Sequence, residues 1–469
     1  MAEPAPAPSG LMLVADGSLH RRDQGRLLVG GAPMRAIVLS DAGAAIVDRW
    51  IDGMPVGDGD AERRLARRLL AGGLVHPHVG PVDDLDVTIV IPVLDDEPGV
   101  CRLVESLRGV PVIVVDDGSM VPLSLETPDV TVLRHDTPQG PGAARMAGLD
   151  AVTTANVLFV DADVELTPDD VAALLGHFVD RDVLAAAPRV ASAPSGGLLA
   201  AYEEDFSPLD LGPSPSPVGP GRLVSYLPSA TLLLRADAVR AVGGFDVTLR
   251  YGEDVDLIWR LAADEGVIRY DPDIVVRHRP RANWRGWVRQ RVAYGSSAAP
   301  LAARHGDATA PARPPTSILF GLVAAAVVPA RAIPGVVSAT TTVVHRWVVA
   351  AFGDEAPPEI TRGVIEHGAE STITALLRAW WPFTLLASLA SRRVRCRAAV
   401  ALIGVTAVEY AQSQRRVDPV RGIALRLIDH LAYGVGVWKG VARHRSAKAL
   451  IPVVGNGGAS TSTTTVPKP

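Results

Sequence analysis

The sequence predicts a chain of three parts, built around an α/β domain with a doubly wound, Rossmann-like sheet. Near-continuous apolar runs alternate with amphipathic helical segments between residues 83 and 312, which is the pattern of strands buried on both faces of a parallel sheet. A hairpin pattern with two helices precedes this region, and an apolar, arginine-rich region follows it. A chain of 469 residues is long enough for about three domains at roughly 100–200 residues each.

Composition excludes several classes of protein. Hydrophobic residues make up 48% of the chain and charged residues 21%, which excludes an intrinsically disordered protein. A mean hydropathy of +0.21 is high for a soluble protein, so membrane contact is expected. Cys101 and Cys396 lie far apart, which argues against a disulfide framework or a structural zinc site. The first ten residues lack a basic segment followed by an apolar one, so no secretory signal is expected and the catalytic part is expected in the cytoplasm.

Residues 1–82 are predicted to form a small separate domain. Two β-rich runs, Arg26–Val29 and Ala36–Leu39, flank a glycine-containing turn and predict a hairpin. A helix capped by Ser40 or Asp41 follows, and a second helix, Asp60–Ala71, ends at a Gly-Gly pair. This inventory is that of a winged helix, and it resembles the PqqD-like peptide-recognition domains of peptide-modifying systems.

Charge separates the possible roles of this small domain. It holds 9 arginines and 9 acidic residues, whereas a DNA-reading wing carries a strong positive excess. Peptide recognition and a purely structural cap therefore both fit the domain better than nucleic-acid binding does.

The central region alternates strands and helices in an order that predicts a parallel sheet. A glycine-rich helix entry, Gly140-Pro141-Gly142, lies between its third and fourth strands. Ligands of such sheets bind at the carboxyl ends of the strands. The expected strands are Val87–Val93, Val112–Val115, Val130–Leu133 and Val157–Val160, with a helix over Pro98–Leu107 after the first.

Acidic and basic side chains follow these strands at their predicted ends. Asp116 and Asp117 stand at a strand-to-loop turn, where a carboxylate can accept the N–H of a nucleobase, and Arg145 suits a phosphate. Asp161 and Asp163 are two residues apart, so an extended backbone would project both to one side. Together they could share Mg²⁺ or Mn²⁺, although a solvated turn or helix cap is the simpler structural interpretation of such a pair.

A second acid pair opens a later helix. Glu253 and Asp254 precede the apolar positions of that helix, and as a structural feature they would only complement the positive end of the helix dipole. As a functional feature, one of them would remove a proton from an attacking hydroxyl group. His278 stands at the end of another predicted strand, where a structural and a ligand role are both open.

Six motifs in order, I-P-V, V-V-D-D-G-S, G-P-G-A-A-R, D-A-D, G-G-F-D and G-E-D-V-D-L, resemble the inverting nucleotide-sugar glycosyltransferases of family 2, which have the GT-A fold. The resemblance covers roughly residues 87–295. It implies that Pro92, Leu94 and Asp117, with Asp116 beside them, line a uracil pocket. It also implies that Arg145 approaches the nucleotide.

The same resemblance assigns the chemistry. Asp161 and Asp163 would hold Mg²⁺ or Mn²⁺, with His278 near the metal or the diphosphate. Asp254 would be the general base, and Glu253 would help to shape the acceptor site. One departure from the family is the absence of the Q-x-x-R-W motif of processive synthases, in place of which the chain has Trp287–Arg291. Extrusion of a long polysaccharide is therefore not expected.

Residues 313–454 are predicted to be helical and membrane-associated, and 455–469 a disordered tail. Residues 376–450 carry 13 Lys or Arg against 3 acids, as expected at the cytoplasmic face of a membrane. Membrane spans and an amphipathic bundle on the membrane surface both fit. Nucleic acid is the weaker partner for this basic region. The candidate spans are Pro315–Ala330, Ile373–Ala390 and Ala398–Val408.

The combined layout resembles the family 2 transferases of a system that makes a peptide-derived redox cofactor. This implies a metal-dependent hexosyltransferase that moves glucose from UDP-glucose to the cofactor precursor and builds a short β-linked oligoglucoside. A transferase acting on a polyprenyl phosphate or a cell-envelope glycan remains an alternative, as does a non-enzymatic, membrane-bound peptide-binding scaffold.

Overall fold

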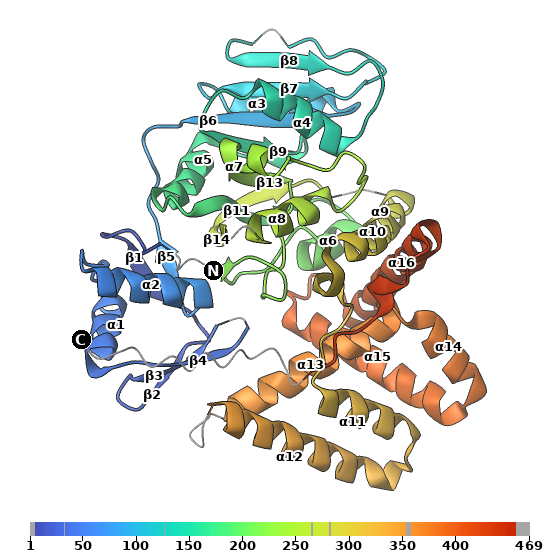
Figure 1. Ribbon diagram of the computed structural model, residues 1–469. Helices are drawn as coiled ribbons and strands as arrows, with labels where there is room; N and C mark the ends of the chain where they lie inside the picture. The colour runs from blue at the N-terminus through green and yellow to red at the C-terminus, as the bar shows by residue number, and fades with distance from the viewer. Residues whose placement is uncertain are drawn as a thin grey trace. The chain divides into compact units, whose positions relative to one another are not determined.

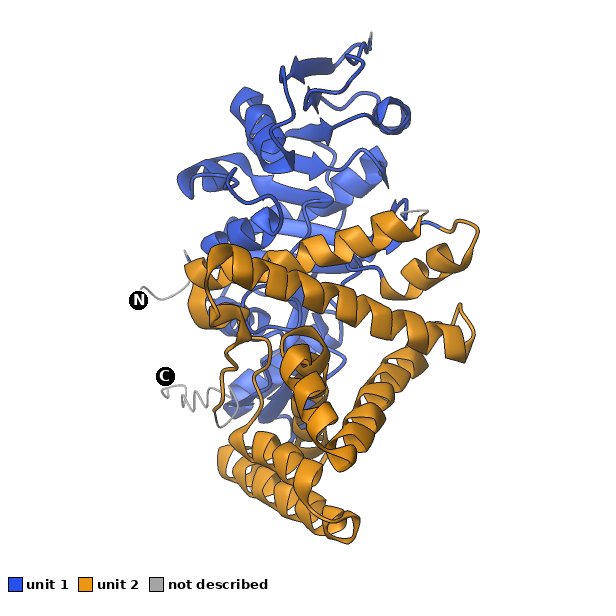
Figure 2. Ribbon diagram, turned by 90° about the vertical axis from the view of Figure 1, so that its right-hand side faces the viewer, with its two compact units in different colours: residues 1–193, 207–280, 462–469 blue, residues 194–206, 281–461 orange. Residues whose placement is uncertain are grey.

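The computed structural model describes residues 5–31, 33–125, 127–263, 266–280, 283–352 and 358–455. The chain forms two compact units (Figures 1 and 2), the first from residues 1–193, 207–280 and 462–469 and the second from residues 194–206 and 281–461. Apart from Gly455, the tail predicted to be disordered lies outside the described residues.

The amino-terminal part of the first unit has two small sheets. The predicted hairpin is confirmed as β3 (Leu27–Gly30) and β4 (Arg35–Val38), and β2 (His20–Arg22) adds a third antiparallel strand. A separate pair joins β1 (Met12–Ala15) to β5 (Val75–His78). The sequence pattern missed β1, β2 and β5. Strands this short show no clear alternating apolar pattern, and the turn that revealed β3 and β4 as a hairpin has no counterpart between β1 and β5, which pair across the two helices.

Two helices complete this part, with the ends that their capping residues predict. In α1 (Asp41–Ile51), the Ser40 hydroxyl accepts the N–H of Gly43 at 3.1 Å. Helix α2 (Asp60–Gly72) ends at Gly73, whose φ of 68° is the left-handed conformation that glycine adopts most easily. The apolar faces of both helices pack into one core with strand residues, and each buried large side chain there contributes about 1.5–3 kcal/mol.

The four strands predicted for the central region all form, and they are parallel in the order β9-β6-β7-β8. Every residue of β7 and β9 is buried, as the continuous apolar runs predict. Their carboxyl ends therefore lie at one edge of the sheet. Their bounds are β6 (Val87–Val93), β7 (Val112–Asp116), β8 (Val130–Arg134) and β9 (Asn156–Val160).

The other half of the sheet is mixed, so the doubly wound parallel pattern holds only for the first half. Strand β13 (Thr231–Arg235) runs antiparallel between β9 and β11 (Val183–Ser192), and β14 (Val267–His278) runs parallel to β11. Two short strands, β10 (Val164–Glu165) and β12 (Ser216–Pro217), pair with β14. Because β13 runs antiparallel to β9, the loop that precedes β13 lies at the edge where β9 ends. There the Asp161 N–H donates to Ala230 O at 3.0 Å.

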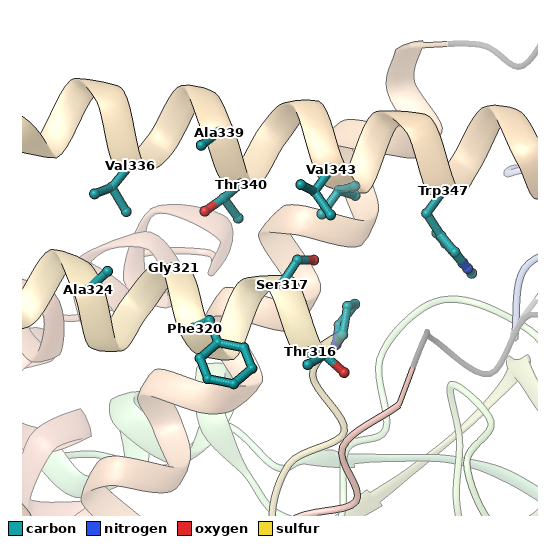
Figure 3. Close-up of a pocket in the computed structure, with 12 residues that line it drawn as sticks. Thr316, Ser317, Phe320, Gly321, Ala324, Val336, Ala339, Thr340, Val343 and Trp347 are labelled. Atoms are coloured by element: carbon teal, nitrogen blue, oxygen red, sulfur yellow. The ribbon is translucent and has the colours of Figure 1, made fainter.

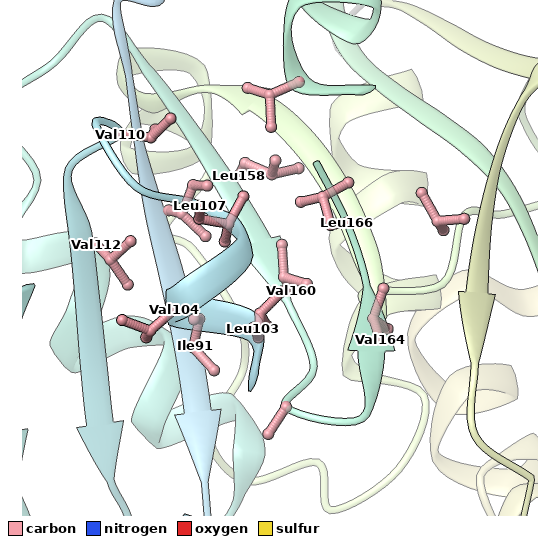
Figure 4. Close-up of a cluster of buried hydrophobic side chains, with 14 of the residues drawn as sticks. Ile91, Leu103, Val104, Leu107, Val110, Val112, Leu158, Val160, Val164 and Leu166 are labelled. Atoms are coloured by element: carbon pink, nitrogen blue, oxygen red, sulfur yellow. The ribbon is translucent and has the colours of Figure 1, made fainter. Parts of the chain in front are cut away.

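Helices pack on the sheet and close its core. Figure 4 shows Leu103 and Val104 of α3 beside Ile91, Leu158 and Val160 of the strands. The predicted glycine-rich helix entry and the helix beginning at Glu253 are both confirmed. The bounds are α3 (Glu97–Ser106), α4 (Pro141–Ala151), α5 (Pro168–Leu175), α7 (Ala236–Ala241) and α8 (Glu253–Ala263), with a 3₁₀ turn at Gly176–Val179.

The second unit is helical and contains a buried polar network. Trp287 Nε1 donates to Glu203 Oε1 at 2.6 Å, and Arg291 pairs with Glu203 and, at 3.0 Å, with Asp429. The segment that replaces Q-x-x-R-W thus ties helices together inside this unit. Its helices are α6 (Leu198–Phe206), α9 (Trp284–Ser296), α10 (Ala298–His305), α11 (Thr316–Val327), α12 (Ile333–Phe352), α13 (Pro358–Arg378), α14 (Trp381–Ala390), α15 (Arg392–Gln412) and α16 (Pro419–His444).

The candidate spans fall on three of these helical regions. Among the described residues no single helix is long and apolar enough to cross a bilayer. Helices α13 and α14, bent by 86° where they meet, reach the required length and hydropathy only as a pair. Helix α11 is apolar but shorter.

Candidate active site

The predicted site residues collect at the edge of the sheet where β6, β7 and β9 end. Pro92 and Leu94 lie at the end of β6, and Asp116 and Asp117 at the end of β7. Leu94 is 48% exposed, so its side chain is accessible to a ligand. The remaining site residues come from α4, α8, β14 and the turn after β9.

Asp117 organises the loop that leads to α4. Its Oδ1 accepts the N–H of Gln139 at 2.9 Å and its Oδ2 that of Gly140 at 2.7 Å, while His135 Nδ1 lies 2.7 Å from Oδ1. Gly118 follows at φ 81°, and a Cβ there would lie 2.8 Å from the backbone of Thr137 and Pro138. The D-D-G-S motif therefore needs its glycine for a close backbone approach.

Asp116 is fully buried and holds the loop that follows β7. It pairs with Arg134 and accepts the Ser119 N–H at 2.8 Å. Burial acts to raise the pKa of Asp116, but the hydrogen bonds from Ser119, Leu123 and Arg134 outweigh it, and the pKa is lowered. This carboxylate stays ionised and shapes the loop.

Asp161 and Asp163 form a turn instead of the extended segment that the sequence predicted. Val164 N–H donates to Asp161 O at 3.1 Å, which closes the turn, and the two side chains have different partners. Asp163 Oδ2 lies 3.0 Å from His278 Nε2. Strand β10 pairs Val164 with His278 in register, so the sheet itself places that histidine beside the D-A-D motif.

Arg145 links the D-A-D motif to the acid pair of α8. Its Nη2 donates to Asp161 Oδ1 at 2.7 Å and its Nη1 to Glu253 Oε1 at 3.0 Å, with only 4% of its side chain exposed. Burial raises the pKa of Asp161, and Arg145 opposes that effect. Among the described residues, no group of three or more His, Cys, Asp or Glu side chains is arranged to hold a metal ion.

The acid pair stands at the beginning of α8. Burial, and then the charge of Asp254, raise the pKa of Glu253 to about 7. Burial also raises the pKa of Asp254. Asp254 Oδ2 accepts the Ser229 N–H at 3.3 Å, and its Oδ1 accepts the Val255 N–H at 2.8 Å. A carboxylate with a raised pKa, held in place by backbone donors, is suited to take up a proton.

Sequence reasoning missed several residues of this edge. Ser229 and Ala230, on the loop before β13, contact Asp254 and the backbone of Asp161. Arg134 and His135 hold the two aspartates of the D-D-G-S motif. Their position at the end of β8, one strand away from that motif, was the signal that could have found them.

Two family models and a curated relative match this chain. The model of glycosyl transferase family 2 matches residues 88–216, and that of glycosyl transferase family group 2 matches residues 156–404. A pre-mycofactocin glycosyltransferase of Mycobacterium tuberculosis, in two strains, is 37% identical over 95% of this chain and 98% of its own length.

Among solved structures, a mannosyltransferase from Pyrobaculum calidifontis in complex with GDP-mannose and Mn²⁺ is similar. It has 16% identity and a TM-score of 0.37, over 64% of this chain and 89% of that one. The family models and the curated relative, and not this structure, confirm the predicted resemblance to family 2 and support the GT-A fold expected from it. The chain belongs to glycosyl transferase family group 2, in one family with the pre-mycofactocin glycosyltransferase that it matches over nearly its whole length.

Proposed function

We propose that the chain is an inverting glycosyltransferase that transfers glucose from UDP-glucose to premycofactocin and builds a short β-linked oligoglucoside. The acceptor follows from the name of the Mycobacterium tuberculosis relative, which matches over 95% of this chain. The geometry that carries the proposal is the Arg145 guanidinium, which joins Asp161 of the D-A-D motif to Glu253 of the acid pair. Donor and acceptor chemistry would then meet at one edge of the sheet.

The donor would lie over the ends of β6 and β7. Pro92, Leu94 and Asp117 would surround the uracil base, with Asp116 fixing the loop on which Asp117 stands. The positive charge of Arg145 lies beside the D-A-D motif, where it would stabilise the negative charge that develops on the departing UDP.

The D-A-D residues would hold a divalent cation. Asp161 and Asp163 supply hard oxygen donors from a single turn, and His278 stands 3.0 Å from Asp163. Mg²⁺ is commonly held by one or two carboxylates, with substrate phosphates and water completing its coordination. A bound Mg²⁺ or Mn²⁺ would supply charge neutralisation at the diphosphate.

Asp254 would act as the general base. As the acceptor hydroxyl attacks the anomeric carbon from the side opposite UDP, its proton passes to Asp254, the bond to UDP breaks, and the configuration inverts. One displacement requires one base and no carboxylate nucleophile. Glu253, paired with Arg145 beside Asp254, would shape the acceptor side of the site.

The two flanking parts would have separate roles, one in binding the acceptor and one in contacting the membrane. The amino-terminal domain is proposed to bind the peptide-derived precursor and raise its concentration near the site. The second unit exposes apolar side chains on α11, α14 and α15 beside arginines of α15, which is the combination that anionic membrane surfaces attract. We place this unit on the cytoplasmic face of the membrane.

Turnover of UDP- and GDP-sugars with Mg²⁺ or Mn²⁺ tests the proposal, first with premycofactocin and then with a polyprenyl phosphate. Wild type is compared with Asp163→Ala and with Asp169→Ala, which removes an exposed acid of α5. The proposal is supported if wild type and Asp169→Ala transfer glucose from UDP-glucose to premycofactocin and Asp163→Ala does not. Transfer only to the polyprenyl phosphate would replace the acceptor, and peptide binding without turnover of any donor would favour the scaffold.

A further inference from the structure

An apolar groove runs between α11 and α12 in the second unit (Figure 3). Its volume is about 640 Å³, and its floor is the contact between Gly321 and Thr340, where a Cβ on the glycine would lie 2.4 Å from Thr340 Oγ1. Side chains of both helices rise on either side of that contact.

The walls of the groove leave apolar surface in water. Phe320 is 68% exposed and Val343 is 54% exposed. The lining has few polar side-chain atoms. They are the hydroxyl groups of Thr316, Ser317 and Thr340 and the indole N–H of Trp347. Contiguous exposed apolar surface of this kind marks a binding site, and an occupant without polar groups would match it.

Arginines gather at the Ala324 end of the groove. Arg393 Nη1 donates to Val327 O at 3.0 Å, and Arg397 Nη1 donates to Ala325 O at 2.7 Å. Both guanidiniums are thus fixed at the carboxyl end of α11, where the helix dipole favours a cation. Each guanidinium has five N–H donors and uses one of them in these bonds, so both remain able to bind an anion.

We propose that this groove binds one acyl chain of an anionic membrane phospholipid, with the lipid phosphate on Arg393 and Arg397. The lining from Thr316 to Ala324 spans about 12 Å at the helical rise of 1.5 Å per residue, which is enough to hold part of an extended acyl chain. The inference rests on the proposed membrane contact and deepens it.

The choice of a lipid follows from the surroundings of the groove. Phe383, Leu386 and Leu389 of α14 and Val400 of α15 are also exposed apolar residues of this unit. Exposed arginines, among them Arg392, Arg393 and Arg395, stand at the start of α15. A peptide occupant would need partners for its backbone amides, which the few polar atoms of the lining cannot supply.

Vesicle flotation and native mass spectrometry of the full chain test the groove. Vesicles contain phosphatidylglycerol with phosphatidylcholine, or phosphatidylcholine alone. Ala339→Phe fills the groove from an exposed position, and Ala424→Phe places the same side chain on an exposed position of α16 as control. Arg393→Gln with Arg397→Gln removes the anion partners, and Arg362→Gln removes an exposed charge of α13.

Wild type and both controls should float with the anionic vesicles and retain one phosphatidylglycerol per chain. The groove variant and the arginine variant should retain at least about tenfold less, while UDP-glucose turnover in detergent is unchanged. Equal lipid retention by Ala339→Phe and Ala424→Phe would show that the groove does not bind the acyl chain. Preference for a polyprenyl phosphate over phosphatidylglycerol would also overturn the proposal. If the wild-type protein itself does not turn over UDP-glucose, that result would count against the proposed transferase and not against the lipid site.

Discussion

Arg67 of α2 forms a bidentate ion pair with Asp180, from the segment that leads into β11. Its Nη1 lies 2.7 Å from Asp180 Oδ2 and its Nη2 2.8 Å from Oδ1, with side chains only 4% and 8% exposed. Asp182 lies 2.8 Å from the same guanidinium. The carbonyls at the carboxyl end of α2 accept further bonds from Arg222 and Arg269. The amino-terminal part of the first unit is therefore attached to the sheet through buried charges.

Breaking this pair should destabilise the first unit. Arg67→Ala leaves Asp180 buried without its partner, which costs about 3–5 kcal/mol, and thermal unfolding should show a large fall in midpoint. Arg64→Ala on the same helix removes an exposed pair with Asp60 and should cost at most about 1 kcal/mol. Equal effects of the two variants would show that the buried pair does not hold the domain.

The same contact bears on tests of peptide recognition. Deleting residues 1–78 would expose Asp180 and the arginines that cap α2, so loss of all activity would report misfolding. The informative result is selective: transfer to premycofactocin should fall more than donor hydrolysis. An unchanged acceptor preference after deletion would make the domain a structural cap.

Most of the first half of the sheet could be predicted from sequence, because β6, β7 and β9 are buried on both faces and need continuous apolar runs. The end of α2 was equally predictable, because glycine adopts the left-handed conformation found at Gly73 most easily. The reversed strand β13 was not, since an apolar run such as Thr231–Arg235 carries no sign of its direction. Its direction depends on pairing with β9 and β11, which are distant in the chain.

The site was predictable as a set of residues but not as a set of contacts. Motif positions located Asp117, Asp161 and Asp254 at strand and helix ends. The bonds of Arg145 to both Asp161 and Glu253 depend on how α4 and α8 approach the sheet, which local patterns do not encode. The turn at Asp161 likewise follows from the pairing of β10 with β14.

Removing the metal should abolish transfer. Asp163→Ala should lower turnover of UDP-glucose by at least about 100-fold, and treatment of wild type with EDTA should do the same until Mg²⁺ or Mn²⁺ is restored. The exposed substitution Asp169→Ala should behave as wild type. Full activity of the wild-type protein in EDTA would remove the metal from the proposed chemistry.

Asp254→Asn should separate binding from chemistry. The amide keeps the shape of the side chain, and its one oxygen can still accept either the Ser229 or the Val255 N–H. It cannot take up the acceptor proton, so transfer should fall about 10²–10⁴-fold. UDP binding, measured by calorimetry, should change little. A parallel loss of UDP binding and transfer would mean that Asp254 holds the donor and is not the base.

Acidification should destabilise the second unit through His430. Its Nδ1 accepts the Arg378 Nε–H at 2.9 Å, so its Nε2 carries the proton directed at Glu409, 3.0 Å away. Burial, with Arg378 and Arg426 nearby, lowers the pKa of His430 from 6.5 to about 4. The neutral form is thus the folded form. Its contribution is complete above pH 6.5 and is lost as pH falls toward 4, with a limit of about 3 kcal/mol.

Comparison of His430→Gln with wild type checks this linkage. The amide can keep the contact with Glu409 but has no ring to protonate. Its thermal midpoint should therefore fall less than that of wild type between pH 7 and pH 5, even if it starts lower. His367→Gln, at an exposed position of α13, should follow the wild-type curve. Parallel curves for all three proteins would mean that protonation elsewhere sets the acid sensitivity of this unit.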